Sequence, residues 1–92
     1  MKKVLIVYGS FAGSTAELAE HMCALLNKNG QQAEAIAADK FSGSLQEYQL
    51  IIVGSAIRAG NPHPSIKNFM EKYKTDLALA NLAVFTVSLS SG

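Results

Sequence analysis

Short apolar runs mark most of the expected strands of this chain. They cover residues 3–8, 50–54 and 82–89, and the first two lack alternating polar positions. Uninterrupted apolar runs of this length are typical of central strands in a parallel sheet, because helices cover both faces of such strands. A weaker strand is expected at 32–37, where alanines alternate with polar residues. This alternation predicts that the weaker strand lies at an edge of the sheet.

Apolar residues at helical spacing predict two helices between these strands. The first covers residues 15–28 and ends at Asn29-Gly30, where glycine suits the left-handed conformation that caps a helix. The second begins at Pro64, since proline suits the first position of a helix. Its apolar stripe comprises Ile66, Phe69, Met70, Tyr73 and Leu77. Residues 44–47 match a capping box and predict one short helical turn.

The alternation of strands and helices predicts an α/β domain with a parallel sheet and right-handed crossovers. In such sheets, ligands bind beyond the carboxyl ends of the strands. Three segments lie at that edge of the expected fold, namely residues 9–15, 54–63 and 88–92. We therefore expect these segments to converge on one ligand site.

The composition fits one small globular domain and excludes several classes of protein. Of the 92 residues, 49% are hydrophobic and 16% are charged, which is too apolar for a disordered chain. The net charge is +1 and the basic residues are dispersed, so nucleic-acid binding has no electrostatic support. No stretch approaches the roughly 20 apolar residues of a membrane span. A single cysteine excludes an internal disulfide framework, and we expect a cytoplasmic protein.

The segment Gly9–Thr15 carries the strongest chemical signal in the sequence. It joins a buried strand to a helix, and the free N–H groups and dipole of a helix N-terminus attract phosphate. The hydroxyls of Ser10, Ser14 and Thr15 add donors where a plain turn needs only one cap. The segment contains no Lys or Arg, which suits the phosphate of a cofactor better than a nucleoside triphosphate.

Other kinds of phosphate site do not fit this sequence. The segment lacks the lysine of a P-loop and the three glycines of the dinucleotide fingerprint, and Asp39 alone is a weak echo of the latter. A receiver domain would need acidic residues where this chain has Gly9-Ser10 and Gly54-Ser55.

Residues 10–15 resemble the phosphate loop of the flavodoxin-like FMN-binding family, which reads roughly S/T-x-T-G-x-T. The match departs from the pattern at Ala12, where a missing hydroxyl removes one phosphate donor, worth about 1–3 kcal/mol. A second similarity is to the flavodoxin-type, menaquinone-dependent protoporphyrinogen oxidase group. It extends over residues 54–60, His63, residues 69–74 and residues 83–89. Together the two similarities cover essentially the whole chain.

The resemblance implies a flavodoxin-like, three-layer open parallel sheet with strand order 2-1-3-4, truncated before the fifth strand. Residues 1–92 would then be the N-terminal portion of the domain, with its C-terminal third missing. The resemblance also implies FMN as the cofactor. The residues expected to bind it are Ser10, Phe11, Ala12, Gly13, Ser14 and Thr15 at the phosphate, Ser55, Ala56, Ile57 and Arg58 on one side of the flavin, and Ser88, Leu89, Ser90 and Ser91 on the other.

The same resemblance implies a redox function similar to that of protoporphyrinogen IX dehydrogenase, with electrons passing through the flavin to a quinone. Two alternatives stay open. One is an electron carrier without a substrate of its own, although carriers commonly have an acidic face and this chain has a net charge of +1. The other is a truncated, non-catalytic interaction module, which Ala12 and the missing C-terminal third favour.

Four side chains outside the phosphate segment invite a chemical role. Arg58 would stabilise the reduced flavin near N1 or bind a carboxylate substrate, and a loop arginine without a partner is the equally weighted alternative. His63 precedes Pro64, so a helix cap is favoured over a proton shuttle. His21 is expected to face solvent, and Cys23 to be a small core residue. We expect no metal site.

The expected fourth strand, residues 82–89, would be an open edge of the sheet. Natural proteins rarely leave such an edge bare, because it pairs readily with another strand. The chain is therefore expected to be a fragment of a longer protein, one half of a split domain, or a self-associating protein. The expected partners are FMN, a redox partner or quinone, and a second copy or a completing chain at this edge.

Overall fold

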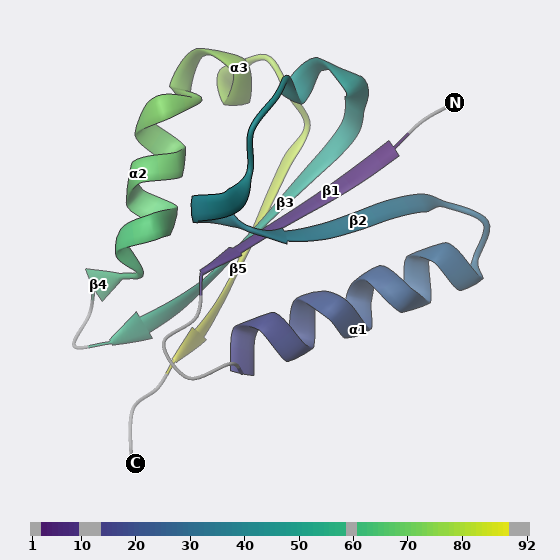
Figure 1. The fold of residues 1–92 in the computed structure, drawn as a ribbon, viewed down its shortest axis with the longest axis horizontal. Helices are drawn as coiled ribbons and strands as arrows, with labels where there is room; N and C mark the ends of the chain where they lie inside the picture. The colour runs from purple at the N-terminus through teal and green to yellow at the C-terminus, as the bar shows by residue number, and fades with distance from the viewer. Residues whose placement is uncertain (1–2, 10–13, 59–60, 89–92) are drawn as a thin grey trace.

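A computed structural model describes residues 3–9, 14–58 and 61–88 (Figure 1). Its elements follow in the order β1 (Lys3–Gly9), α1 (Ser14–Lys28), β2 (Gln32–Ala37), η1 (Ala38–Lys40), η2 (Leu45–Glu47), β3 (Tyr48–Arg58), β4 (Asn61–Pro62), α2 (Pro64–Lys72), α3 (Lys74–Ala78) and β5 (Leu82–Ser88). No helix in these described ranges is long and apolar enough to cross a bilayer.

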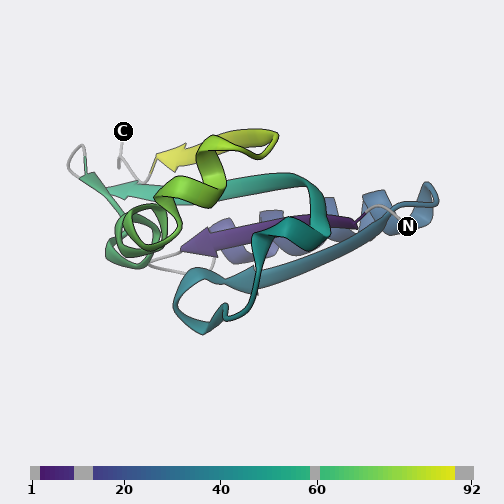
Figure 2. The same ribbon diagram turned by 90° about the horizontal axis from the view of Figure 1, so that it is seen from above.

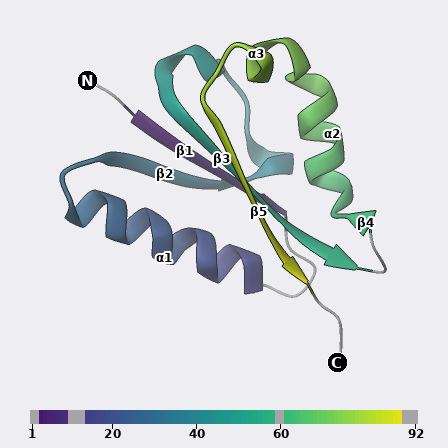
Figure 3. The same cartoon turned by 180° about the vertical axis from the view of Figure 1, so that it is seen from behind.

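The main sheet is parallel, with strand order β2-β1-β3-β5, which confirms the predicted order 2-1-3-4 with β5 as the fourth expected strand. The weak strand β2 lies at an edge, as its alternating pattern predicted. Gly9 of β1 is in register with Ser55 of β3, and Ile57 is in register with Ser88 of β5. The carboxyl ends of β3 and β5 therefore point to the same end of the sheet, where α1 begins (Figure 3).

Helices cover the two faces of the sheet, with α2 on the near side in Figure 2 and α1, drawn paler, on the far side. Successive side chains of a strand point to opposite faces, so Leu5 and Val7 join the core under α2 while Val4 and Ile6 join the core under α1. Burial on both faces is the reason that these strands contain no polar alternation.

Two elements differ from their expected bounds. The third strand is longer than 50–54, because β3 runs from Tyr48 to Arg58. Its last residues form an antiparallel pair with β4, so part of the expected loop 54–63 is a hairpin. The second expected helix is divided into α2 and α3 at Tyr73, whose backbone is not helical (φ −107°, ψ 23°). The spacing of the apolar residues in the predicted stripe continues unchanged across this break.

Local caps follow the sequence closely. Gly30 closes α1 in the left-handed region, with φ 89°. The Ser44 hydroxyl accepts a hydrogen bond from the Gln46 N–H at 3.1 Å and begins the short turn η2. His63 caps α2 and Pro64 occupies its first turn. These caps hold the helix ends that border the carboxyl and amino edges of the sheet.

Candidate functional site

The carboxyl edge of the sheet brings together part of the expected FMN site. Residues 9, 55 and 63 lie there on β1, β3 and the cap of α2. The expected site residues Ser10, Phe11, Ala12, Gly13, Leu89, Ser90 and Ser91 lie outside the described residues. The side chains of Ser14, Ile57, Arg58 and Ser88 are likewise not described, although their backbones belong to α1, β3 and β5.

Thr15 lies in the first turn of α1 and is fully buried, with 0% of its surface exposed. Its Oγ1 is buried and makes no hydrogen bond within the described part of the chain. A buried hydroxyl without a partner costs about 1–3 kcal/mol, so proteins rarely retain one without reason. The first N–H groups of any helix lack partners within the helix, so an anion at this helix start would satisfy them together with the Thr15 hydroxyl.

Ser55 and Ala56 are both buried, with 3% and 1% of their surfaces exposed. The Ser55 hydroxyl accepts a hydrogen bond from the His63 N–H at 3.1 Å and donates one to the Ala56 carbonyl at 3.1 Å. Its hydrogen bonds therefore join the end of β3 to the start of α2. In this arrangement the hydroxyl is engaged inside the protein.

The His63 ring caps α2 through a single ring nitrogen. Nδ1 accepts a hydrogen bond from the Ser65 N–H at 3.1 Å and lies 2.8 Å from the Ser65 hydroxyl. An acceptor at Nδ1 must be unprotonated. The pair is a helix cap between residues two apart, as the position before Pro64 predicted.

Gly9 lets the start of α2 approach the end of β1. A Cβ at this position would lie 2.8 Å from both Ile66 Cγ1 and the Ser65 hydroxyl, and 3.1 Å from His63 Cβ. A side chain therefore has no room there. The residue that enters the phosphate segment is thus packed directly against the cap of α2.

A cavity of about 380 Å³ lies beside this contact. Its lining residues are Tyr8, Gly9, Ala16, Ala37, Asp39, Lys40, His63 and Ser65. They come from β1, α1, β2, η1 and α2, so both faces of the sheet contribute to it. The cavity places one carboxylate and one ammonium group near the capping histidine.

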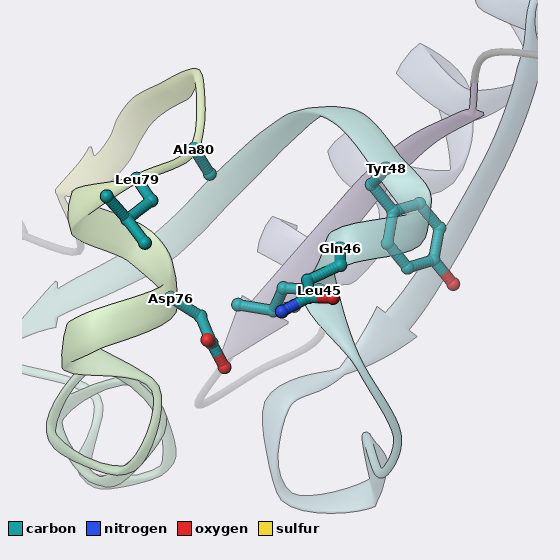
Figure 4. Close-up of a pocket in the computed structure, with 6 residues that line it drawn as sticks. All are labelled: Leu45, Gln46, Tyr48, Asp76, Leu79 and Ala80. Atoms are coloured by element: carbon teal, nitrogen blue, oxygen red, sulfur yellow. The ribbon is translucent and has the colours of Figure 1, made fainter.

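A second cavity, of about 240 Å³, lies among η2, the start of β3, α3 and the turn before β5 (Figure 4). Leu45, Gln46, Tyr48, Asp76, Leu79 and Ala80 line it. The amino ends of parallel strands rarely carry ligand sites. No cluster of three metal-ligating side chains occurs among the described residues. His21 is exposed and Cys23 is half-buried, in keeping with the non-catalytic interpretation of both.

Gly9 was predicted as part of the phosphate segment, but neither its close contact with α2 nor the link between Ser55 and His63 was predicted. The sequence held only a faint signal for Gly9, a glycine where an apolar strand ends. For Ser55, nothing in the sequence shows whether a hydroxyl at the end of a strand faces a ligand or the next helix.

Comparisons with known proteins agree with this geometry. A family model of the flavodoxin domain matches residues 5–92. The quinone-dependent protoporphyrinogen IX dehydrogenase of Escherichia coli is 28% identical over 88 residues, which cover 95% of this chain and 49% of that protein. The chain thus spans about half the length of the curated relatives that it matches.

Solved structures show the same fold. Oxidised flavodoxin 1 from Bacillus cereus has a TM-score of 0.77 and 26% identity, covering 92% of this chain and 60% of that chain. A flavodoxin of Fusobacterium nucleatum bound to flavin mononucleotide has a TM-score of 0.77 and 14% identity, covering 96% and 53%. At 14% identity the likeness shows the fold alone. Because the family model matches all but the first four residues, the chain belongs to the flavodoxin domain family.

Proposed function

We propose that this chain binds FMN at the carboxyl edge of its sheet and serves in electron transfer. Membership of the flavodoxin family and the structural likeness to a flavodoxin bound to FMN support this proposal. The observation that carries it is the orphaned hydroxyl of Thr15 in the first turn of α1. A phosphate at this helix start would satisfy that donor together with the free N–H groups.

The described residues fit a phosphate in both charge and shape. The positive end of the α1 dipole, about half an elementary charge, would attract the anion without a lysine or arginine. Gly9 allows the chain to turn from β1 into the phosphate segment while packed against α2. In this proposal Ser10 to Thr15 hold the phosphate, while 55–58 and 88–91 border the flavin.

When bound, FMN supplies the electron-transfer chemistry. The chain's own residues bind, orient and shield it. Ser55 and Ala56 are buried at the end of β3, on the side where the flavin is proposed to lie. Arg58 follows on the same strand, and its guanidinium would add positive charge beside the flavin.

The Thr15 hydroxyl gives the sharpest test of this function. Thr15→Val removes the hydroxyl at nearly constant volume, so the affinity for FMN should fall about 10- to 100-fold, as for a lost hydrogen bond to a charged group. The stability of the apoprotein should be unchanged or higher, because an unsatisfied buried group is removed. Thr15→Ser retains the hydroxyl and is the matched control. Equal FMN affinity of the valine variant and the wild type would reject the assignment.

The similarity to protoporphyrinogen IX dehydrogenase favours a substrate-oxidising enzyme that uses a quinone as acceptor, and the carrier is the second candidate. Anaerobic mixing of the FMN-loaded chain with protoporphyrinogen and a quinone separates them. Porphyrin formation that depends on both supports the enzyme, and Arg58→Ala should then raise KM or shift the flavin potential. Electron exchange with a redox protein but no porphyrin would support the carrier.

We further propose that the open side of β5 is an interface. Within the described residues, β5 pairs with β3 alone. Leu82 and Val84 are 39% and 58% exposed on the α2 side. An apolar groove of about 340 Å³ runs between α2 and β5, lined by Val53, Ile66, Met70 and Val84 among others. A second copy or a completing chain would cover this surface.

We also propose a cytoplasmic setting, which suits the single cysteine.

A further inference from the structure

One hydrogen bond links the end of β3 to the start of α2, and a second caps α2 itself. The Ser55 hydroxyl accepts from the backbone N–H of His63 at 3.1 Å, and the His63 ring accepts from the backbone N–H of Ser65 at 3.1 Å. Between these residues the chain doubles back through the β3–β4 pair, in which Ile57 is opposite Pro62. The bond to Ser55 therefore holds the return of the hairpin against β3, and the ring cap fixes His63 at the start of α2.

The same cap is in contact with the entry to the phosphate segment. Gly9 has no space for a Cβ, because His63 Cβ and the Ser65 hydroxyl already occupy it. A shift of the first turn of α2 would therefore change its contact with Gly9 at the end of β1. His63 thus lies at the junction of β1, β3 and α2.

The cap exists only while Nδ1 is unprotonated. Protonation converts Nδ1 from an acceptor to a donor, so the Ser65 N–H loses its partner. It also places a positive charge at the N-terminus of α2, where the helix dipole is itself positive. Both changes act against the present position of the cap. Histidine is the side chain that changes charge between about pH 5 and pH 8.

Within the described part of the chain, charged and titratable groups share the lining of the 380 Å³ cavity with His63. Asp39 and Lys40 come from η1, and Tyr8 comes from β1. The cavity borders both His63 and Ser65.

We propose that His63 is a proton-controlled positioning residue, whose neutral ring holds the start of α2 against Gly9 and whose protonation releases it. A consequence, which rests on the proposed function, is that acid weakens FMN binding. It does so because it loosens both the β3–β4 hairpin and the entry to the phosphate segment. The effect on FMN affinity should be about fivefold, the fold-change that corresponds to the loss of one N-cap.

The first experiment follows the Ser65 and Ile66 amides by NMR in the apoprotein between about pH 5 and pH 8. We expect both amides to shift with pH and their hydrogen exchange to become faster in acid. His63→Asn supplies a cap that does not titrate, so both responses should vanish. His21→Asn removes the exposed histidine on α1 and should leave them intact. A Ser65 amide that does not respond to pH in the wild type, or that still titrates in His63→Asn, overturns the proposal.

The second experiment measures FMN affinity over the same pH range. The wild type and His21→Asn should lose about fivefold in acid, and His63→Asn should hold a constant affinity. Wild-type and His63→Asn curves of the same shape would contradict the link to the cofactor. If FMN does not bind at any pH, the proposed function fails, and the Ser65 amide alone decides the role of His63.

Discussion

At the scale of single residues, two positions in this sheet require glycine because of close contacts, and not because of unusual backbone angles. Gly9 leaves room for the start of α2, and Gly54 leaves room for the ring of Phe85 on the neighbouring strand. A Cβ at Gly54 would overlap that ring. The ring belongs to the core on the α1 face, so both glycines are required by packing.

Gly54→Ala should destabilise the protein by about 1–3 kcal/mol, as expected for overpacking of a core. The free energy of unfolding in urea measures the effect. Phe85→Leu in the Gly54→Ala background should recover part of the loss, because a smaller side chain removes the overlap, and the two changes should be strongly non-additive. Strict additivity of the two substitutions would contradict the contact.

Among the described residues, Tyr48 has a clear change in its pKa. Burial, followed by the hydrogen bond that its hydroxyl donates to the Glu34 carboxylate at 2.9 Å, raises the pKa of Tyr48 from 10.0 to about 12. The folded state therefore holds the proton more tightly than the unfolded state does. This contribution to stability is complete below pH 10 and is lost as the pH rises toward about 12.

Glu34→Gln should move the pKa of Tyr48 back toward its ordinary value, because it removes the negative charge of the carboxylate. Ultraviolet absorbance of the phenolate measures the titration, and Tyr48→Phe identifies the signal among those of the other tyrosines. An unchanged titration in Glu34→Gln would show that burial alone raises the pKa.

At the scale of elements, Asn27 holds α1 to β2 through the backbone of Ala33. Its Nδ2 donates to the Ala33 carbonyl at 3.1 Å, and its Oδ1 accepts from the Ala33 N–H at 3.0 Å. The side chain thus replaces a sheet partner at the start of an edge strand. The side chain of Asn29, two residues later, donates a hydrogen bond to the Leu25 carbonyl at 3.0 Å and, within the described part of the chain, makes none to β2.

Asn27→Ala should therefore cost about 1–2 kcal/mol of stability, because two backbone groups lose their partner. Asn29→Ala is a matched control on the same exposed helix end and should cost less. Thermal unfolding of the two variants compares them directly. Equal losses in both would mean that the link to Ala33 contributes nothing specific.

The sequence predicted the elements whose signal is repeated along the chain. Central strands and the helix stripes follow from burial at regular spacing, so β1, α1 and β5 appear close to their expected bounds. The two-residue strand β4 has no period that a sequence pattern could reveal. The break at Tyr73 was equally hidden, since the apolar spacing continues across it.

The site was predicted less completely for a physical reason. A phosphate-binding helix start depends on local residues, so the role of Thr15 could be proposed from sequence. The bond between Ser55 and His63 joins residues on different elements, and its existence depends on how α2 packs against β1. Such a contact is a property of the tertiary structure and leaves no local pattern.

At the scale of the whole molecule, β5 determines how the sheet meets its surroundings. Val84 stands in the middle of the open strand and is 58% exposed. On the opposite face, Leu18 and Leu25 of α1 are 41% and 48% exposed. Apolar side chains are thus exposed on both faces of the sheet, as expected where further elements normally cover it.

Val84→Lys should weaken association at this edge at least tenfold, because a charge on an edge strand opposes pairing. Light scattering over a concentration series measures it, with Ala78→Lys on exposed α3 as a control for added charge. A dimer that Val84→Lys dissociates supports a second copy as the occupant. A monomer that unfolds without cooperativity supports a completing chain. A wild-type monomer that unfolds cooperatively at every concentration contradicts both.

The most direct measurement of the central claim is a titration of the purified chain with FMN, with riboflavin as the ligand that lacks the phosphate. Quenching of flavin fluorescence reports binding of either ligand. If the start of α1 anchors the phosphate, FMN will bind and riboflavin will bind far more weakly. Equal affinities for the two flavins, or no binding of either, would contradict the account.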